Sequence, residues 1–98
     1  MATKKKNLRP VVERVQTGVR MEKRLVKVLK ALAEYHEMTL GDLLEGIILH
    51  VFEGKTPFNE DALQVIASLK QIYRLDLDAS ASHRLIEKRE DSSDEKAE

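Results

Sequence analysis

The apolar and polar positions of the chain follow a period of two over residues 14–21 and a helical period afterwards. In the first segment, apolar or β-branched side chains alternate with largely polar ones, which predicts a strand with one buried face. The side chains on that face are Val15, Thr17, Val19 and Met21. No other segment alternates convincingly. Because an unpaired strand leaves backbone groups unsatisfied, we expect this one to pair with the same strand of a second copy.

Three later segments place apolar residues three and four positions apart, the spacing of amphipathic helices. They predict helices over residues 22–36, 40–53 and 59–74. Thr39 and Asn59 stand where the N-caps of the second and third helices belong, and Gly54 stands where a glycine ends the second. The apolar stripe of the second helix exceeds what one neighbouring helix covers, which favours an obligate dimer whose stability depends on concentration.

The same pattern divides the chain into four parts. We expect a flexible basic arm over 1–12, a folded unit of one strand and two helices over 13–54, an accessory helix over 58–75 and an acidic, largely disordered tail over 76–98. The tail prediction rests on its last twelve residues, which are polar and charged except for Ala97. The expected fold class is therefore mainly α with one N-terminal β-strand.

Charge separates the two ends of the chain, although 17 basic and 17 acidic side chains cancel over its 98 residues. Residues 1–30 hold ten Lys or Arg and two acids, a net charge of +8, and residues 31–98 hold seven against fifteen, a net charge of −8. The polar face of the first predicted helix begins with Lys23, Arg24, Lys27 and Lys30. This division predicts a polyanion-binding end and an acidic remainder.

Nothing in the sequence points to catalysis or to a metal. Cysteine is absent, which excludes disulfides and thiolate ligands, and His36, His50 and His83 are far apart. We therefore expect no enzyme, no metal and no cofactor. No apolar run approaches the ~20 residues of a membrane span, and no apolar stretch follows the first lysines, so we expect neither a membrane span nor a secretory signal.

The order of strand, helix, capped turn and helix, directly after a basic arm, resembles the ribbon-helix-helix family of DNA-binding proteins, which includes Arc-type and methionine-repressor-type regulators. The resemblance covers about residues 13–53. It rests on the alternating segment Arg14–Met21, the amphipathic segment Leu25–His36 and the capped opening Met38–Leu44. It implies an intertwined dimer whose strands pair antiparallel across the two chains into a ribbon that enters the DNA major groove. The third helix is additional to the family's minimal fold.

The resemblance assigns base contacts to the outward side chains of the ribbon. These are Gln16, Gly18 and Arg20. Gln suits adenine and Arg suits guanine, because each forms two hydrogen bonds to that base. Two features depart from the family: Gly18 replaces the usual polar side chain, and Met21-Glu22-Lys23 replaces a proline-containing link into the first helix.

Phosphate contacts are expected at the start of the second helix and along the basic arm. The resemblance implies that backbone N–H groups of Leu40 and Gly41, capped at Thr39, meet a phosphate, which a helix N-terminus favours electrostatically. Arg14 is expected nearer the DNA backbone than the base-contacting residues. Non-specific phosphate contacts are expected from Lys4, Lys5 and Lys6.

Together these features predict a dimeric, sequence-specific DNA-binding protein, a cytoplasmic transcriptional repressor that joins the nucleoid when bound to DNA. Its expected partners are double-stranded DNA and a second copy, with further assembly on DNA left open.

Other classes of function remain as alternatives. An antitoxin-type or plasmid-partition-type protein would use residues 75–98 to bind a partner protein. A structural oligomer without nucleic acid gives no reason for the +8 end. A helix-turn-helix with residues 40–53 as recognition helix is excluded on charge, because that helix has no Lys or Arg to meet phosphates. The acids it exposes are Asp42, Glu45 and Glu53.

Overall fold

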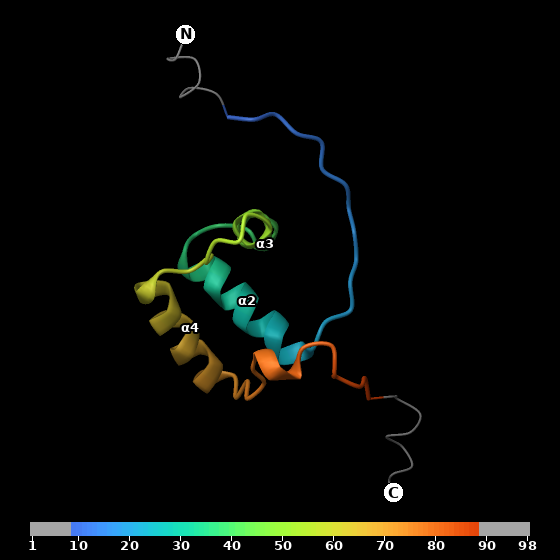
Figure 1. Cartoon of the computed structure of the whole chain (residues 1–98), viewed down its shortest axis with the longest axis vertical. Coiled ribbons are helices and arrows are strands. Elements are labelled where there is room, and N and C mark those ends of the chain that lie inside the picture. Colours follow the sequence, from blue (N-terminus) through green and yellow to red (C-terminus); the bar gives the residue numbers. More distant parts are fainter. Residues whose placement is uncertain (1–8, 89–98) are drawn as a thin grey trace, which may run out of the picture.

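The computed structural model describes residues 9–88, which hold three α-helices and one short 3-10 helix (Figure 1). They are α2 (Lys23–Tyr35), α3 (Leu40–Phe52), α4 (Glu60–Ile72) and η1 (Ala79–Ala81). The three helices predicted from the apolar spacing are confirmed, with ends at most two residues from those expected. Within the described range, no helix has the length and apolar character needed to cross a membrane.

Side-chain caps explain why α3 and α4 begin where they do. The Thr39 hydroxyl accepts a hydrogen bond from the backbone N–H of Asp42 at 3.0 Å, and the side-chain oxygen Oδ1 of Asn59 accepts one from the backbone N–H of Ala62 at 2.8 Å. Each bond satisfies an N–H group that has no partner inside its helix. Gly54 follows α3 with a φ of 72°, a backbone conformation that glycine adopts without strain. These three sequence predictions are confirmed.

Helix α2 begins at a less usual cap, Glu22. Its carboxylate accepts a hydrogen bond from the backbone N–H of Leu25 at 2.9 Å and another from Arg24 Nε at 2.9 Å. Burial raises the pKa of Glu22, but the hydrogen bonds from Arg24 and Leu25 and the attraction of the Arg24 charge outweigh burial. The pKa of Glu22 therefore lies below its usual 4.5.

The predicted N-terminal β-strand is wrong, because residues 9–88 contain no strand. Residues 9–22, called the strap below, run past the helices as a stretched-out segment (blue in Figure 1). A strand exists only where its N–H and C=O groups pair with those of a neighbouring strand. No other described segment pairs with residues 14–21 in this way. Alternating side chains over 14–21 were therefore not sufficient, and the predicted ribbon-helix-helix fold is not formed in this part of the chain.

The core lies where α2 packs against α3 and α4. Leu32, Ala33 and Leu43 form its buried cluster, and the Leu32 side chain is only 1% exposed. The side chains packed against this cluster are Leu29, Ile47, Phe58, Val65, Ile66 and Leu69. A fully buried leucine contributes about 1.5–3 kcal/mol by leaving water. Since three of the packing residues belong to α4, this helix shares one core with α2 and α3.

Arg24 joins the end of α4 to the beginning of α2. Its guanidinium donates to the Arg74 carbonyl at 2.9 Å and to Asp76 Oδ1 at 3.0 Å. Arg74 has a φ of 58°, and the chain turns there so that Leu75 enters the core, 7% exposed. The sequence grouped Arg24 with the solvent-facing lysines of α2, whereas the structure turns it toward α4.

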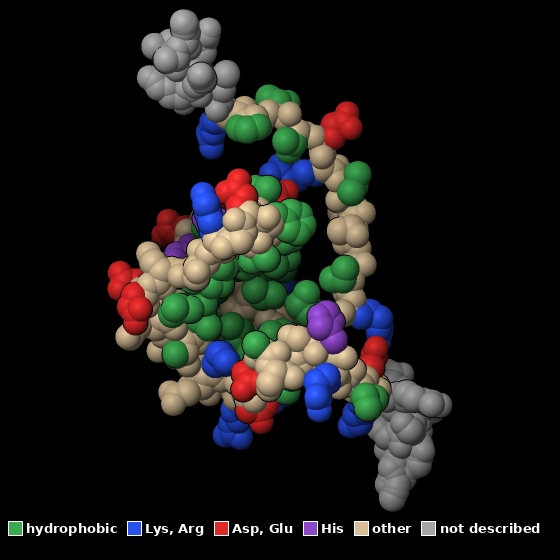
Figure 2. Space-filling view, viewed as in Figure 1, with side chains coloured by type: hydrophobic (Ala, Val, Ile, Leu, Met, Phe, Trp, Pro, Cys, Tyr) green, Lys and Arg blue, Asp and Glu red, His purple; other side chains and the backbone are tan. Residues whose placement is uncertain are grey.

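Helix α3 leaves much of its apolar surface uncovered. Leu49 is 66% exposed and Phe52 is 81% exposed, and Ile48 and Val51 are exposed as well. In Figure 2, hydrophobic side chains gather between the helices and on the side of the helices that faces the strap. A helix that is apolar on several sides is expected to be covered on several sides, so the described chain leaves the packing of α3 incomplete.

Candidate nucleic-acid interface

A row of lysines lies on the outer face of α2. Lys23, Lys27 and Lys30 are four and three residues apart and are all exposed. By helical spacing they lie opposite the buried Leu32. None of the three forms an ion pair with another residue of the described range. This row, called the lysine row below, therefore presents three positive charges on one side of α2, with the exposed Glu34 at the C-terminal end of the same face.

Arg14, in the strap, is held against α3. Its guanidinium donates two hydrogen bonds to the Glu45 carboxylate, one from Nε and one from Nη2, each 2.8 Å long. The hydrogen bond to Glu45 and the attraction of its charge raise the pKa of Arg14. The same hydrogen bond and attraction lower the pKa of Glu45, against a smaller effect of burial. The predicted phosphate contact is thus occupied by a carboxylate of its own chain.

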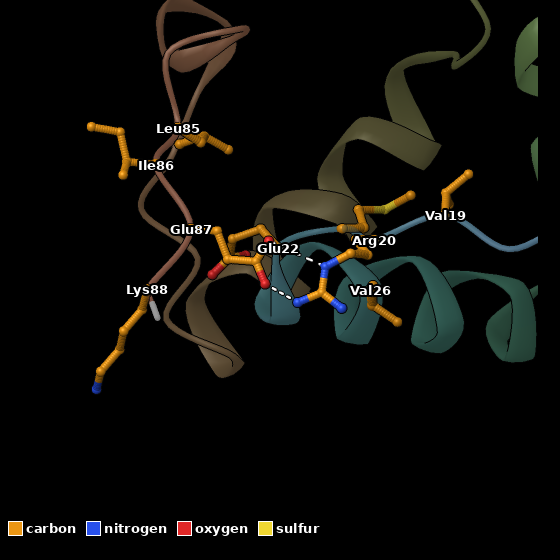
Figure 3. A pocket seen from close by; sticks show the side chains of 9 residues that line it. Val19, Arg20, Glu22, Val26, Leu85, Ile86, Glu87 and Lys88 are labelled. Atoms are coloured by element: carbon orange, nitrogen blue, oxygen red, sulfur yellow. Dashed lines mark hydrogen bonds and ion pairs between the residues drawn. The ribbon is translucent and has the colours of Figure 1, made fainter. Parts of the chain in front are cut away.

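Arg20, at the other end of the strap, is held by Glu87. The guanidinium points at the carboxylate in Figure 3, and two nitrogens, Nε and Nη2, donate to its two oxygens. Both side chains are exposed, at 83% for Arg20 and 60% for Glu87. An open cavity of about 730 Å³ separates this end of the strap from residues 85–88. The predicted base contact is therefore accessible, and like Arg14 it is already paired.

The two other predicted base contacts lie between these arginines. Gln16 and Gly18 are exposed in the strap. A side-chain atom added at Gly18 would meet nothing within 4 Å, and Gln16 takes part in no side-chain hydrogen bond with another described residue. Both positions are open to a partner, and nothing in the described chain orients them.

The start of α3 carries the other predicted phosphate contacts. Thr39 is exposed and its hydroxyl is used for the cap, while Leu40 is half-buried and Gly41 is exposed. The backbone N–H groups of Leu40 and Gly41 precede the first hydrogen bonds of the helix, so they are free of helical acceptors. Asp42 lies in the same turn and offsets part of the attraction of this helix end for an anion.

The structure groups the predicted residues only in part. Arg14 contacts α3, the helix that begins after Thr39, whereas Arg20 lies beside the C-terminal segment. Lys4, Lys5 and Lys6 lie outside the described residues. The lysine row was visible in the sequence as helical spacing, although it was not assigned to the site.

The two acidic partners were missed, because 31 residues separate Arg14 from Glu45 and 67 separate Arg20 from Glu87. No local pattern marks such distant pairs. Within residues 9–88, no group of three or more His, Asp or Glu is placed to hold a metal ion.

Comparisons with protein-family models, with curated proteins and with solved structures found no match.

Proposed function

We propose that this chain is a double-stranded-DNA-binding regulator that acts as a homodimer. The observation that carries the proposal is the lysine row, in which Lys23, Lys27 and Lys30 lie exposed directly after the strap and form no ion pair with another described residue. The sequence of residues 1–30 carries a net charge of +8, which adds to the attraction of the chain for a polyanion. Duplex DNA carries about one negative charge per 1.7 Å of its axis and is the polyanion that such a surface fits.

The spacing of the lysine row supports a contact with the DNA backbone. Lys23 and Lys30 are seven residues apart, about 10 Å along a helix that rises 1.5 Å per residue. Over such a length the duplex carries several phosphates, at about one negative charge per 1.7 Å of its axis. The row can therefore contact the DNA backbone, which positions a protein on DNA without reading its sequence.

Sequence discrimination is assigned to the strap. Gln16 and Arg20 have side chains that bind adenine and guanine edges in the major groove, and both are exposed. In this proposal the strap reads bases as an extended segment, while the lysine row holds the backbone.

A second copy of the chain is the partner assigned to the outer face of α3. By helical spacing, Gly41, Ile48 and Phe52 lie together on the side turned away from the buried Leu43, a side that also carries Glu45, the partner of Arg14. A side-chain atom added at Gly41 meets nothing within 4 Å, so this position leaves room for a close neighbour. Two copies would present two lysine rows to one duplex, which raises affinity through effective concentration.

Removing the lysine row tests the proposal. The variant Lys23→Gln/Lys27→Gln/Lys30→Gln should bind duplex DNA more weakly, whether the duplex has a preferred or a scrambled sequence. The slope of log K against log salt should flatten by about 0.9 for each phosphate that the variant no longer neutralises, up to about 2.7 for three. Fluorescence anisotropy titrations at several salt concentrations measure both effects.

The matched control removes three positive charges elsewhere on the described surface, as Lys55→Gln/Lys70→Gln/Arg84→Gln. Its binding should change little, because these residues lie outside the lysine row and the strap. Equal weakening in both variants would reduce the effect to net charge and contradict the proposed surface. A parent protein that binds no duplex DNA at low salt would favour the structural oligomer instead.

A further inference from the structure

Two arginines of the strap are bound by acids that come from distant parts of the chain. Arg14 is held by Glu45 of α3, and Arg20 is held by Glu87, which follows η1. Both contacts use two nitrogens of the guanidinium and two oxygens of the carboxylate. A guanidinium binds a phosphate, or the O6 and N7 atoms of guanine, with the same two-point geometry.

The contact with Glu87 brings a whole segment against the strap. In Figure 3, Glu87 lies across from Arg20, and Leu85 and Ile86 precede it along the same stretch. This stretch and the end of the strap form the two walls of the cavity of about 730 Å³. Ile86 is 94% exposed and Leu85 is 51% exposed, so the apolar packing of this stretch is limited. Among residues 85–88, the side-chain hydrogen bonds to the strap are those between Glu87 and Arg20.

From this geometry we propose that Glu87 competes with DNA for Arg20. The Glu87 carboxylate binds the Arg20 guanidinium until a phosphate or a guanine edge displaces it. This inference rests on the proposed DNA-binding function. The residues from Glu87 to the end of the sequence carry six acids against three basic side chains, so the competitor lies in a segment that repels phosphates. Free protein and DNA complex then differ in which anion Arg20 holds.

The contact between Arg20 and Glu87 is strong enough to lower the affinity for DNA but too weak to prevent DNA binding. An ion pair between exposed side chains is weak and is screened by salt. A duplex offers many phosphates at once and displaces a single carboxylate readily. Releasing Arg20 should therefore tighten DNA binding by about two- to fivefold, which lies within the range that exposed ion pairs give.

The test is a titration of duplex DNA with the full chain carrying Glu87→Gln, at one fixed salt concentration. This variant keeps the size of the side chain and removes its charge, and it should bind about two- to fivefold more tightly than the parent. The matched control is Glu60→Gln, which removes one exposed negative charge at the start of α4 without touching the strap. The control should bind with the affinity of the parent.

A double-variant cycle separates competition at Arg20 from a general change in charge. In an Arg20→Gln background, Glu87→Gln should give no further gain, because the competitor no longer has a guanidinium to occupy. An undiminished gain in that background, or an equal gain from Glu60→Gln, would overturn the inference. If parent and Glu87→Gln bind DNA equally, only the competitor role fails. If neither binds DNA, the proposed function fails as well.

Discussion

The ionisation of Glu22 is tied to the formation of helix α2. Its carboxylate caps α2 through the N–H of Leu25 and also holds Arg24, which in turn binds the carbonyl of Arg74 at the end of α4. The Glu22 carboxylate therefore lies where the beginning of α2 meets the end of α4. The pKa of Glu22 lies below its usual 4.5, because these hydrogen bonds and the Arg24 charge outweigh burial.

The low pKa of Glu22 predicts how stability depends on pH. A carboxylate with a lower pKa in the folded chain stabilises the fold fully above its unfolded pKa, and loses that contribution as pH falls through the folded value. Glu22→Gln should therefore lower Tm at pH 7, and the difference from the parent should shrink between pH 5 and pH 2. Thermal unfolding followed by circular dichroism measures both. Two melting curves that stay separated by the same interval at every pH would contradict this role.

The exposed Glu37 gives the control for this measurement. It forms no ion pair with another described residue, so Glu37→Gln should leave the Tm and its pH dependence close to those of the parent.

Residue-scale features were predictable from sequence where their cause is local. Thr39 and Asn59 each cap a helix through an N–H group three residues away, and both were identified. Glu22 also acts over three residues, but glutamate is not among the preferred capping residues, so its role gave no clear signal. Arg20 and Glu87 meet only because the whole chain folds back, and neither neighbourhood indicates the other.

At the scale of elements, helix α3 exposes apolar side chains that no other described element covers. Leu49 and Phe52 are 66% and 81% exposed, so replacing them removes little packing inside the described chain. Leu49→Gln/Phe52→Gln should therefore keep its helix content while the dimer dissociates at higher concentration than the parent. Sedimentation velocity over a range of micromolar concentrations measures the shift.

Helix α4 provides the matched control for this face. Leu63 and Ile72 are also exposed, at 46% and 67%, and they belong to an element that is not assigned to the dimer. Leu63→Gln/Ile72→Gln should leave the oligomeric state unchanged. A parent chain that sediments as a folded monomer at micromolar concentration would contradict the proposed homodimer.

The elements also mark the limit of sequence-based prediction for this chain. Helices were located closely, because their hydrogen bonds are internal and their apolar spacing is regular. The strand was not, because the alternation over 14–21 describes side chains only, whereas a strand depends on a hydrogen-bonded neighbour that the described chain lacks. The packing of α4 on α2 was not predicted either. The apolar stripe of α4 indicated that this helix packs against another surface, but the stripe did not identify α2 as that surface.

At the scale of the whole molecule, charge division links fold and proposed function. The positive part comprises the strap and the outer face of α2, and acids from α3 and from the C-terminal segment reach back to two of its arginines. The lysine row is left without such partners in the described range. We therefore expect backbone contacts to dominate affinity, and the two paired arginines to adjust it.

Selection from random duplex DNA at physiological salt tests the central claim of DNA binding most directly. The proposed homodimer, with Gln16 and Arg20 reading bases in each copy, predicts that successive rounds enrich a short motif present twice, as a palindrome or a direct repeat. A pool that stays random while the protein remains folded would contradict sequence-specific DNA binding by this chain.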